Sequence, residues 1–488
     1  MKTLNKDLLQ TGATEELPEK VLQFGTGVLL RGLPDYFIEK ANRQRIFNGR
    51  IVVVKSTGQG GTDEFARQDG LYTLHTNGLQ NGKEVRETLL VSAISRVLHA
   101  ATQWETIAQI AEHPDISIVI SNTTEVGIVL DDQDEPRAAP PSSFPGRLTA
   151  LLYRRFVHFN GDPDKGWVIL PTELISDNGA TLKSIVLELA RRHGLGDEFA
   201  RWIVEANDFC NTLVDRIVPG KLPENEAEEA EKQLGYRDAL AIMAEPFRLW
   251  AIESDNDRVH DRLAFAQGDE GMIITPDISK FKELKLRLLN GSHTFSCGLA
   301  ILCGFSTVKV AMQHDGFARY VRRLMFREIA DTIIGNGISE AEALDFAANV
   351  MDRFANPFLD HAWQSISLNY TSKMQMRNVA SLERFIRKNR AVPRCMALGF
   401  AAYLYFMQGT HQVADEHAGW LAGLWSTVDG EELVVEVLRN EDRWGMDLNG
   451  LPGLADAIRY FLVQLQQKNA LEVIQELNEE MELKLQNK

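Results

Sequence analysis

Hydrophobic residues in the first 280 positions come in short runs that are separated by longer helical patterns. Four of these runs end at a turn, and they read KVLQFGTG from Lys20, RIVVVKSTG from Arg50, ISIVISNTTE from Ile116 and GWVILPTEL from Gly166. Strands that alternate with helices indicate a parallel sheet with crossover connections. The pattern therefore predicts an α/β fold class, in which residues 1–280 form an N-terminal Rossmann-like parallel-sheet domain.

The pattern changes after about residue 280. Long amphipathic stretches follow, such as DGFARYVRRLMFREIADTII at 315–334 and EAEALDFAANVMDRF at 340–354, and strand patterns nearly vanish. Apolar residues at the helical period are typical of helices that bury one face. Residues 281–488 are therefore predicted to form a mostly α-helical C-terminal domain. We expect a ligand near the boundary, because ligand sites favour domain interfaces.

A glycine turn follows the first predicted strand. The stretch VLQFGTGVLLRGLPDYF places Gly25 and Gly27 where a dinucleotide fold needs a tight turn and a close backbone approach to a pyrophosphate. The third glycine of the G-x-G-x-x-G fingerprint would fall at Leu30, so the fingerprint is incomplete. The turn by itself leaves a dinucleotide site and a structural turn both open.

The end of the second predicted strand bears on the choice of cofactor. NAD-binding folds usually place an acidic residue there for the ribose hydroxyls. Here the strand ends in Lys55, Ser56 and Thr57, and no carboxylate comes before Asp63. The residues alone leave NAD and NADP open and lean slightly towards NADP.

Composition narrows the class of protein. The 488 residues carry a formal net charge of −16, with 44% hydrophobic and 25% charged residues, which argues for a globular protein without a nucleic acid partner. An apolar run of about 18 residues, as a membrane helix needs, is absent, and the start MKTLNKDLLQTGATEELPEK lacks a secretory pattern. The four cysteines form no C-x-x-C pair, which argues against a structural zinc site. We therefore expect a reduced, cytoplasmic protein without a membrane partner.

Three polar residues interrupt a leucine-rich segment, ELKLRLLNGSHTFSCG from Glu283. On a regular helix, Lys285, Asn290 and His293 would lie at about 0°, 140° and 80° and share one arc. Such a stripe suits the wall of a water-poor catalytic site. The alternative is a capped break at Asn290, Gly291 and Ser292, where each polar group is satisfied locally.

These three residue types fit the oxidation of a secondary alcohol. A lysine can take the hydroxyl proton if burial lowers its pKa, an amide can hydrogen-bond the developing alkoxide, and an imidazole can orient the substrate oxygen. A competing Tyr-x-x-x-Lys spacing at Tyr36 and Lys40 lies directly after the glycine turn. That place is too early in the chain for a short-chain dehydrogenase, and we interpret the spacing as chance.

Several segments together resemble one family. KLRLLNGSH at 285–293 is similar to the active-site segment of the polyol-specific long-chain dehydrogenases, the mannitol dehydrogenase family. FCNTLVDRIVP at 209–219 and SDNG at 176–179 resemble two further family motifs. QDGLYTL, NTTE, EPFRLWAIE and RFANPFLDH are also similar, and the matches run in the family order from residue 21 to about 377.

The resemblance implies a Rossmann domain, a helical domain, and NAD as cofactor without a metal. It implies that Lys285 is the general acid/base, that Asn178 and Asn290 bind the reacting oxygen, and that His293 assists. Asp215 would lie in the substrate site. The resemblance also implies a set of residues that contact the cofactor, which are Phe24, Gly25, Gly27, Val28, Leu29, Thr124 and Glu125.

The resemblance is strongest to a branch that reduces a keto-uronate to an aldonate with NADH. A fructuronate or mannitol oxidoreductase, and a nucleotide-binding protein that has lost catalysis, are the alternatives. A sugar acid substrate requires a fixed cation in a chain of such negative charge. NPFLDHAWQSISLNYTSKMQMR offers His361, Lys373 and Arg377, and we favour Lys373, with solvated surface charge as the alternative. The chain is expected to be a monomer or a small homo-oligomer.

Overall fold

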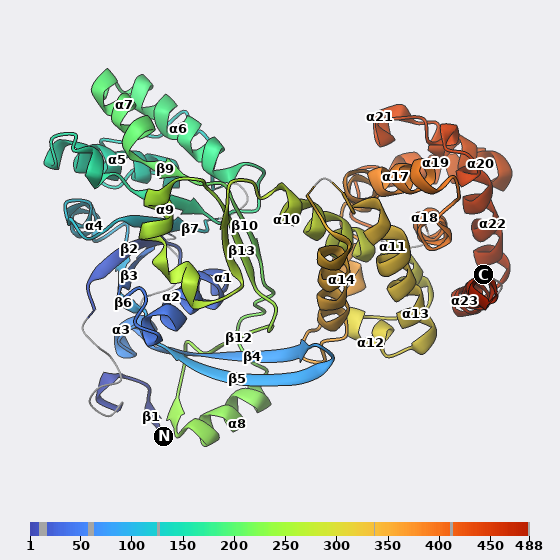
Figure 1. Ribbon diagram of the computed structural model, residues 1–488, viewed down its shortest axis with the longest axis horizontal. Coiled ribbons are helices and arrows are strands. Elements are labelled where there is room, and N and C mark those ends of the chain that lie inside the picture. Colours follow the sequence, from blue (N-terminus) through green and yellow to red (C-terminus); the bar gives the residue numbers. More distant parts are fainter. Residues whose placement is uncertain (9–16, 57–62, 124–126, 336, 410–412, 487–488) are drawn as a thin grey trace. The chain divides into compact units, whose positions relative to one another are not determined.

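The computed structural model describes residues 1–8, 17–56, 63–123, 127–335, 337–409 and 413–486. The chain divides into two compact units (Figure 1). Unit 1 comprises Met1–Asn77 and Glu84–Ile278, and unit 2 comprises Gly78–Lys83 and Ser279–Lys488. The sequence pattern had placed the boundary at residue 280.

A six-stranded parallel sheet forms the centre of unit 1, as predicted. Its strand order is β6-β3-β2-β7-β8-β9, and every neighbouring pair is parallel. The strands are β2 (Glu19–Phe24), β3 (Arg50–Lys55), β6 (Ile94–His99), β7 (Ile118–Ser121), β8 (Val168–Pro171) and β9 (Asp208–Phe209). The four apolar runs picked out in the sequence are β2, β3, β7 and β8, so the Rossmann-like fold class is confirmed.

Helices cover both faces of this sheet, which is why its strands read as continuous apolar runs. Val21 of β2 belongs to one core, together with Phe37, whereas Leu22 belongs to the other core, together with Leu148. On the first face lie α1 (Val28–Gly32) and α2 (Pro34–Arg43) (Figure 1). On the second face lie α4 (Trp104–Ile110), α5 (Phe144–His158), α6 (Asn178–Arg192) and α7 (Asp197–Ala206).

Two three-stranded sheets, which lie mainly in unit 1, were not predicted from the sequence. One has the order β10-β13-β14, formed by β10 (Thr212–Asp215), β13 (Leu249–Glu253) and β14 (Met272–Thr275). The other has the order β12-β4-β5, formed by β12 (Ile242–Ala244), β4 (Tyr72–Gln80) and β5 (Lys83–Val91). The first of these sheets contains Val214 and Asp215, the first two residues of the VDRIVP motif, at the end of β10.

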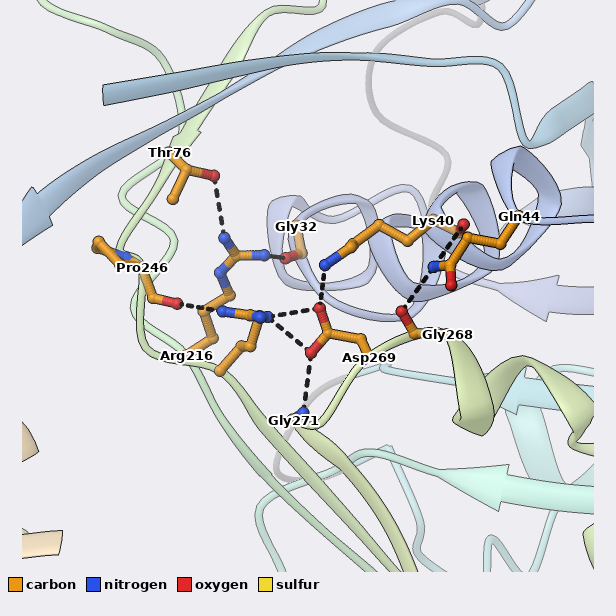
Figure 2. Close-up of polar contacts among 10 residues, drawn as sticks. Gly32, Lys40, Gln44, Thr76, Arg216, Pro246, Gly268, Asp269 and Gly271 are labelled. Carbon is orange, nitrogen blue, oxygen red and sulfur yellow. Dashed lines mark hydrogen bonds and ion pairs between the residues drawn. The ribbon is translucent and has the colours of Figure 1, made fainter. Parts of the chain in front are cut away.

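A buried polar network holds the loop after β10. The guanidinium of Arg216 donates to the Gly32 carbonyl oxygen at 2.6 Å and to the Thr76 hydroxyl at 3.2 Å (Figure 2). It also donates to the Glu245 carbonyl oxygen at 2.9 Å. It also lies over the ring of Tyr36, with its central carbon 4.5 Å from the ring centroid. The loop is therefore fixed to α1, β4 and the segment before β13 through one side chain.

A second set of contacts in the same network centres on Asp269, whose carboxylate is fully buried. Lys40 and Arg248 both form ion pairs with it, and the Gly271 N–H donates to it at 2.8 Å (Figure 2). Lys40 and Arg248 also lie over the Tyr36 ring. The Tyr36 and Lys40 spacing therefore has a structural reason in α2, which a search for catalytic dyads does not consider.

Unit 2 is mostly helical, as predicted. Two buried helices, α11 (Ser292–Leu302) and α18 (Arg394–Phe406), cross at glycines, since a Cβ on Gly399 would lie 2.6 Å from the Phe295 carbonyl oxygen. Glu328 caps α18, because its carboxylate accepts from the N–H groups of Cys395 and Met396 at 2.9 and 2.8 Å. The other main helices include α13 (Asp315–Arg323), α14 (Glu340–Phe354), α16 (Tyr370–Met374), α17 (Ala380–Asn389), α19 (Ala418–Thr427), α22 (Leu454–Gln467) and α23 (Ala470–Gln486).

Three helical segments of unit 2 have the wider π-helical hydrogen-bond pattern. They are η4 (Lys285–Gly291), η5 (Leu324–Ile329) and η7 (Gln375–Val379). Such segments are rare and often occur at functional sites. No helix among the described residues is both long enough and apolar enough to span a membrane.

Candidate functional site

The glycine turn of unit 1 lies between β2 and α1, and its two glycines have different roles. Gly25 has a φ of +126°, and a Cβ there would lie 2.8 Å from both the Asn122 carbonyl oxygen and a methyl carbon of Leu30. Leu30, which stands where the third glycine of the fingerprint would be, is fully buried. The fold therefore requires glycine at position 25. A Cβ on Gly27 would meet no atom within 4 Å, so its open side permits a ligand to approach the backbone.

The other predicted cofactor residues lie around this turn. The Phe24 side chain is fully buried and packs on Phe144, with ring centroids 5.1 Å apart, and its carbonyl oxygen accepts from the Asn122 N–H at 3.1 Å. The side chain therefore presents no open face to a ligand. Val28 and Leu29 are half-buried at the start of α1. Thr124 and Glu125 lie outside the described residues.

A pocket of about 620 Å³ opens in unit 1 where β3 and β7 end. Ser56, the first residue after β3, lines it, and its hydroxyl oxygen is buried without a hydrogen-bond partner among the described residues. The rest of the lining comprises Thr123, Gly127, Val129, Leu130, Asp131, Asp132, Ser142, Ser143, Phe144 and Arg147. An unsatisfied hydroxyl and two carboxylates suit a ligand that carries hydroxyl groups.

Asn178 is 1% exposed, and its side-chain amide is occupied by the chain itself. The amide nitrogen donates to the carbonyl oxygens of Pro171, Glu173 and Thr212 at 3.0, 3.1 and 3.2 Å. The amide oxygen accepts from the N–H groups of Gly179 and Thr212, both at 2.9 Å. These contacts hold β8, α6 and β10 together and give Asn178 a positioning role. Direct contact with a reacting oxygen remains a prediction.

Asp215 is the last residue of β10 and is 6% exposed. It lies in unit 1, directly before the Arg216 anchor, so the buried network fixes its backbone. The Asn178 contacts with Thr212 hold the other end of the same strand. Position and burial agree with a site residue whose side chain must be held in one place.

The segment from Lys285 to Gly291 is continuous with the following helix α11, so a capped break at Asn290–Ser292 is wrong. The expectation of regular helical geometry is wrong too, because the segment is the π-helix η4. Hydrogen bonds of a π-helix join residues five apart, which is the separation of Lys285 and Asn290. The two residues therefore come closer to one face than the angles of a regular helix allow. Both are half-buried.

Gly291 permits a close contact between η4 and η7. A Cβ there would lie 3.1 Å from the end of the Asn378 side-chain amide in η7 and 3.6 Å from the Arg377 carbonyl oxygen. With its amide nitrogen turned inward, Asn378 donates to the Gly291 and Arg377 carbonyl oxygens at 3.2 and 3.3 Å. Arg287 adds a hydrogen bond of 2.6 Å to the same Arg377 oxygen. Two π-helical segments are thus held against each other.

His293 is 8% exposed and lies among aromatic rings. Its ring stacks on Phe354, with centroids 4.0 Å apart, and meets His361 edge-on at 5.2 Å. Burial lowers the pKa of His293 well below its ordinary value, and the nearby His361 and the cations Arg353, Arg377 and Lys373 lower it further. The imidazole is therefore neutral near pH 7, so it carries no charge into its surroundings.

The structure brings His293, His361 and Lys373 together within unit 2. Burial lowers the pKa of His361, and the charges of Lys373 and Arg353 add to this effect. Lys373 is half-buried, its Nζ donates to the Ile366 carbonyl oxygen at 3.0 Å, and burial together with Arg377 lowers its pKa. We call Arg353, Lys373 and Arg377 the cation cluster.

Arg353 was not predicted as a site residue. It is 6% exposed although it lies on α14, and charged residues on helices are usually solvated. Its only sequence signal was its place at the start of RFANPFLDH, next to Phe354. Among the described residues, no group of three or more His, Cys, Asp or Glu side chains could hold a metal ion.

The two units match two family models in turn. Residues 19–265 match the mannitol dehydrogenase Rossmann domain, and residues 277–466 match the mannitol dehydrogenase C-terminal domain. The chain belongs to the mannitol dehydrogenase family.

Similar proteins of this family cover nearly the whole chain. An altronate oxidoreductase of Bacillus subtilis is 37% identical over 466 residues, which are 95% of each chain. One of Bacteroides thetaiotaomicron is 37% identical over 483 residues, covering 97% of this chain and 99% of that protein. The fold is similar to that of the Pseudomonas fluorescens mannitol 2-dehydrogenase in ternary complex with NAD and D-mannitol, with a TM-score of 0.70, 24% identity, and 98% and 99% of the two chains covered. A substrate-free D-sorbitol dehydrogenase gives a TM-score of 0.78 at 21% identity, with 97% of this chain and 100% of that one covered.

The buried histidines predict how stability depends on pH. Because the folded-state pKa of His293 is lowered, the unfolded chain binds a proton below about pH 6.5 that the folded chain does not bind. Stability is therefore full above this pH and falls as the pH decreases, by at most about 1.4 kcal/mol per pH unit for one histidine. Urea midpoints at pH 8, 7, 6 and 5 measure the slope. His293→Phe, which keeps a ring against Phe354, should flatten it, and an unchanged slope would contradict the neutral buried imidazole.

Proposed function

We propose that this protein is an NAD-dependent oxidoreductase that interconverts D-tagaturonate and D-altronate in hexuronate catabolism. Membership of the mannitol dehydrogenase family supports oxidoreductase chemistry. The altronate oxidoreductases that match nearly the full chain support this substrate pair. The four cysteines are free thiols, which supports a reducing compartment such as the cytoplasm.

The observation that carries the choice of a sugar acid is the cation cluster next to His293. Arg353, Lys373 and Arg377 all lie close enough to His293 for their charges to lower its pKa. A neutral polyol has no need of such charge, whereas a carboxylate gains charge-assisted hydrogen bonds from it. We therefore assign Lys373 and His361 to the substrate, Lys373 as a cation for the carboxylate and His361 as a hydrogen-bonding group. Asp215 of unit 1 is proposed as a third substrate contact.

Lys285 is the proposed acid/base. In the direction of reduction its ammonium gives a proton to the carbonyl oxygen, and in oxidation its amine takes the hydroxyl proton. Asn290, one π-helical turn along, would donate its amide N–H to the same oxygen as negative charge develops there. His293 is neutral and buried, so it can fix the orientation of a hydroxyl without adding a charge that opposes Lys285. Asn178 is retained as a proposed contact of the reacting oxygen, with its positioning of β10 as the role that its hydrogen bonds support.

The residues of unit 1 fit a dinucleotide. Gly25 is required by the turn, Gly27 leaves open space over the backbone, and the orphaned Ser56 hydroxyl lies in the pocket where β3 ends. When bound, NADH supplies the hydride that the carbonyl carbon receives.

The residues that line the pocket support NAD over NADP. The residues at the end of β3, taken alone, had slightly favoured NADP. Of the two carboxylates in the pocket lining, Asp132 forms an ion pair with Arg192 at 2.6 Å, whereas Asp131 would repel a phosphate and accept a hydrogen bond from a ribose hydroxyl. The guanidinium of Arg147 already donates to the carbonyl oxygens of Pro141 and Ser142. We therefore propose that Asp131, from the segment before α5, takes the place of the acid that the end of β3 lacks.

A panel of substrates and cofactors tests this proposal. NADH or NADPH is mixed with tagaturonate, fructuronate or fructose, and the loss of absorbance of the reduced cofactor gives kcat/KM for each pair. The highest value is expected for tagaturonate with NADH. A higher value for fructose than for tagaturonate would overturn the uronate substrate, and a higher value with NADPH would overturn the cofactor assignment.

Replacement of the proposed acid/base gives a second test. Lys285→Ala should lower kcat by about 10²–10⁴-fold, the usual cost of losing a general acid/base, while the NADH dissociation constant from fluorescence titration stays unchanged. Lys285→Arg should be similarly slow, because arginine does not release its proton. Lys388→Ala, at an exposed ion pair with Asp331, is the matched control and should be as active as wild type. Turnover of Lys285→Ala at the level of this control would rule out the mechanism.

A further inference from the structure

The side chain of Arg377 is connected by hydrogen bonds to the proposed catalytic segment. Its Nη1 donates to the hydroxyl oxygen of Thr294 at 3.2 Å, and that hydroxyl donates to the carbonyl oxygen of Asn290 at 2.8 Å. The Thr294 carbonyl oxygen in turn accepts from the Tyr370 hydroxyl at 2.8 Å. Arg377 is thus tied to the residue after His293 and, through one hydroxyl, to the backbone of Asn290.

The guanidinium of Arg377 has no carboxylate partner among the described residues. Among the described residues, neither Arg377 nor Lys373 forms an ion pair with an Asp or Glu, and their hydrogen bonds go to a hydroxyl and a carbonyl oxygen. Arg377 is half-buried, and burial lowers its pKa. Nearby Lys373 adds a like charge, since Arg377 lowers the pKa of that lysine. Two cations held together without a counter-ion are costly unless an anion joins them.

The free donors of Arg377 match a carboxylate. A guanidinium carries five N–H donors in a planar fork, and in the described part of the chain only Nη1 has a side-chain partner, Thr294. Nε and Nη2 remain for a ligand, and an arginine fork binds both oxygens of a carboxylate at once. Lys373, four residues earlier on the same helical run, can contribute only a point charge.

We propose that Arg377 is the residue that sets specificity for a charged sugar, by binding the carboxylate of the keto-uronate through its free N–H groups while Thr294 holds the guanidinium. This assignment rests on the proposed function and refines it. Lys373 strengthens the local positive charge, whereas Arg377 supplies the directional contact that distinguishes a uronate from a neutral ketose. The contact also fixes the substrate relative to Asn290, because Thr294 bonds both.

The test compares a charged and a neutral substrate on the same variants. Arg377→Met should raise KM for tagaturonate by about 10- to 100-fold, the effect of losing one hydrogen bond between charged groups, and leave kcat at saturation within about threefold. Its kcat/KM for fructose should be unchanged, so the ratio of the two specificity constants falls. Arg377→Lys, which keeps the charge but loses the fork, should lie between Arg377→Met and wild type. Arg387→Met, ten residues along on α17 in an exposed pair with Glu383, is the matched control.

A measurement of altronate binding tests the role of Arg377 without relying on catalytic turnover. With NAD present, altronate should raise the melting temperature of wild type and of the Arg387→Met control but not that of Arg377→Met. Equal losses on tagaturonate and fructose, or an unchanged altronate shift in Arg377→Met, would overturn the specificity role and leave a structural one. A wild type that reduces fructose but no keto-uronate would overturn the proposed function itself, so the two failures are distinguishable.

Discussion

The proposed catalytic residues of unit 2 depend on one contact, in which the π-helical segments η4 and η7 meet at Gly291. Segment η4 carries Lys285 and Asn290, and η7 carries Arg377 and Asn378. They approach closely because position 291 has no side chain and because Asn378 and Arg287 both bond to carbonyl oxygens at the contact. A Cβ at position 291 requires the Asn378 amide to move, because the two would lie only 3.1 Å apart.

The wider turn of η4 has a chemical consequence. It brings residues five apart onto one face, and the following regular turn of α11 adds His293 three residues later. The proposed acid/base and the proposed amide donor could then reach the same oxygen, while the cation cluster lies near His293. The contact that shapes the proposed catalytic segment also holds the segment that carries Arg377.

In unit 1, hydrogen bonds of buried side chains hold β10 and the loop that follows it in place. Arg216 and Asn178 each use all the polar groups of their side chains on neighbouring backbone or hydroxyl partners, and both hold β10 or the loop that follows it. Buried polar groups that are fully satisfied give a unique arrangement, which a proposed site residue such as Asp215 would require. Arg216 and Asn178, although they lie in family motifs, therefore have a structural role that does not require them to contact the substrate.

The sequence predicted the larger features because their signals are local. The apolar runs of β2, β3, β7 and β8 are short and bounded by turns, and the helical period beyond residue 280 is long, so the α/β sheet and the helical domain could be read directly. The small sheet β10-β13-β14 was missed because β10 and β13 lie within FCNTLVDRIVP and EPFRLWAIE, which were interpreted as family motifs and not as strands.

The geometry of the proposed site depends on contacts between residues far apart in the sequence, which a local sequence pattern does not predict. The π-helical turn of η4 could not be predicted, since Gly291 meets Asn378 from a segment 87 residues later. The occupied amide of Asn178 and the buried guanidinium of Arg353 depend in the same way on distant partners. The residue types of the site could therefore be predicted, but their spatial relations could not.

The most direct test of the account is the turnover of Gly291→Ala compared with Gly423→Ala. A Cβ at 291 lies 3.1 Å from the end of the buried Asn378 side chain, so this amide must move by a few tenths of an ångström and its hydrogen bonds to η4 and η7 change. We predict a loss of about tenfold or more in kcat with unchanged NADH binding. Gly423 lies in helix α19 with no atom within 4 Å of an added Cβ, and its replacement should leave kcat unchanged. Equal activity of the two variants would contradict the claim that the contact at Gly291 positions the catalytic residues.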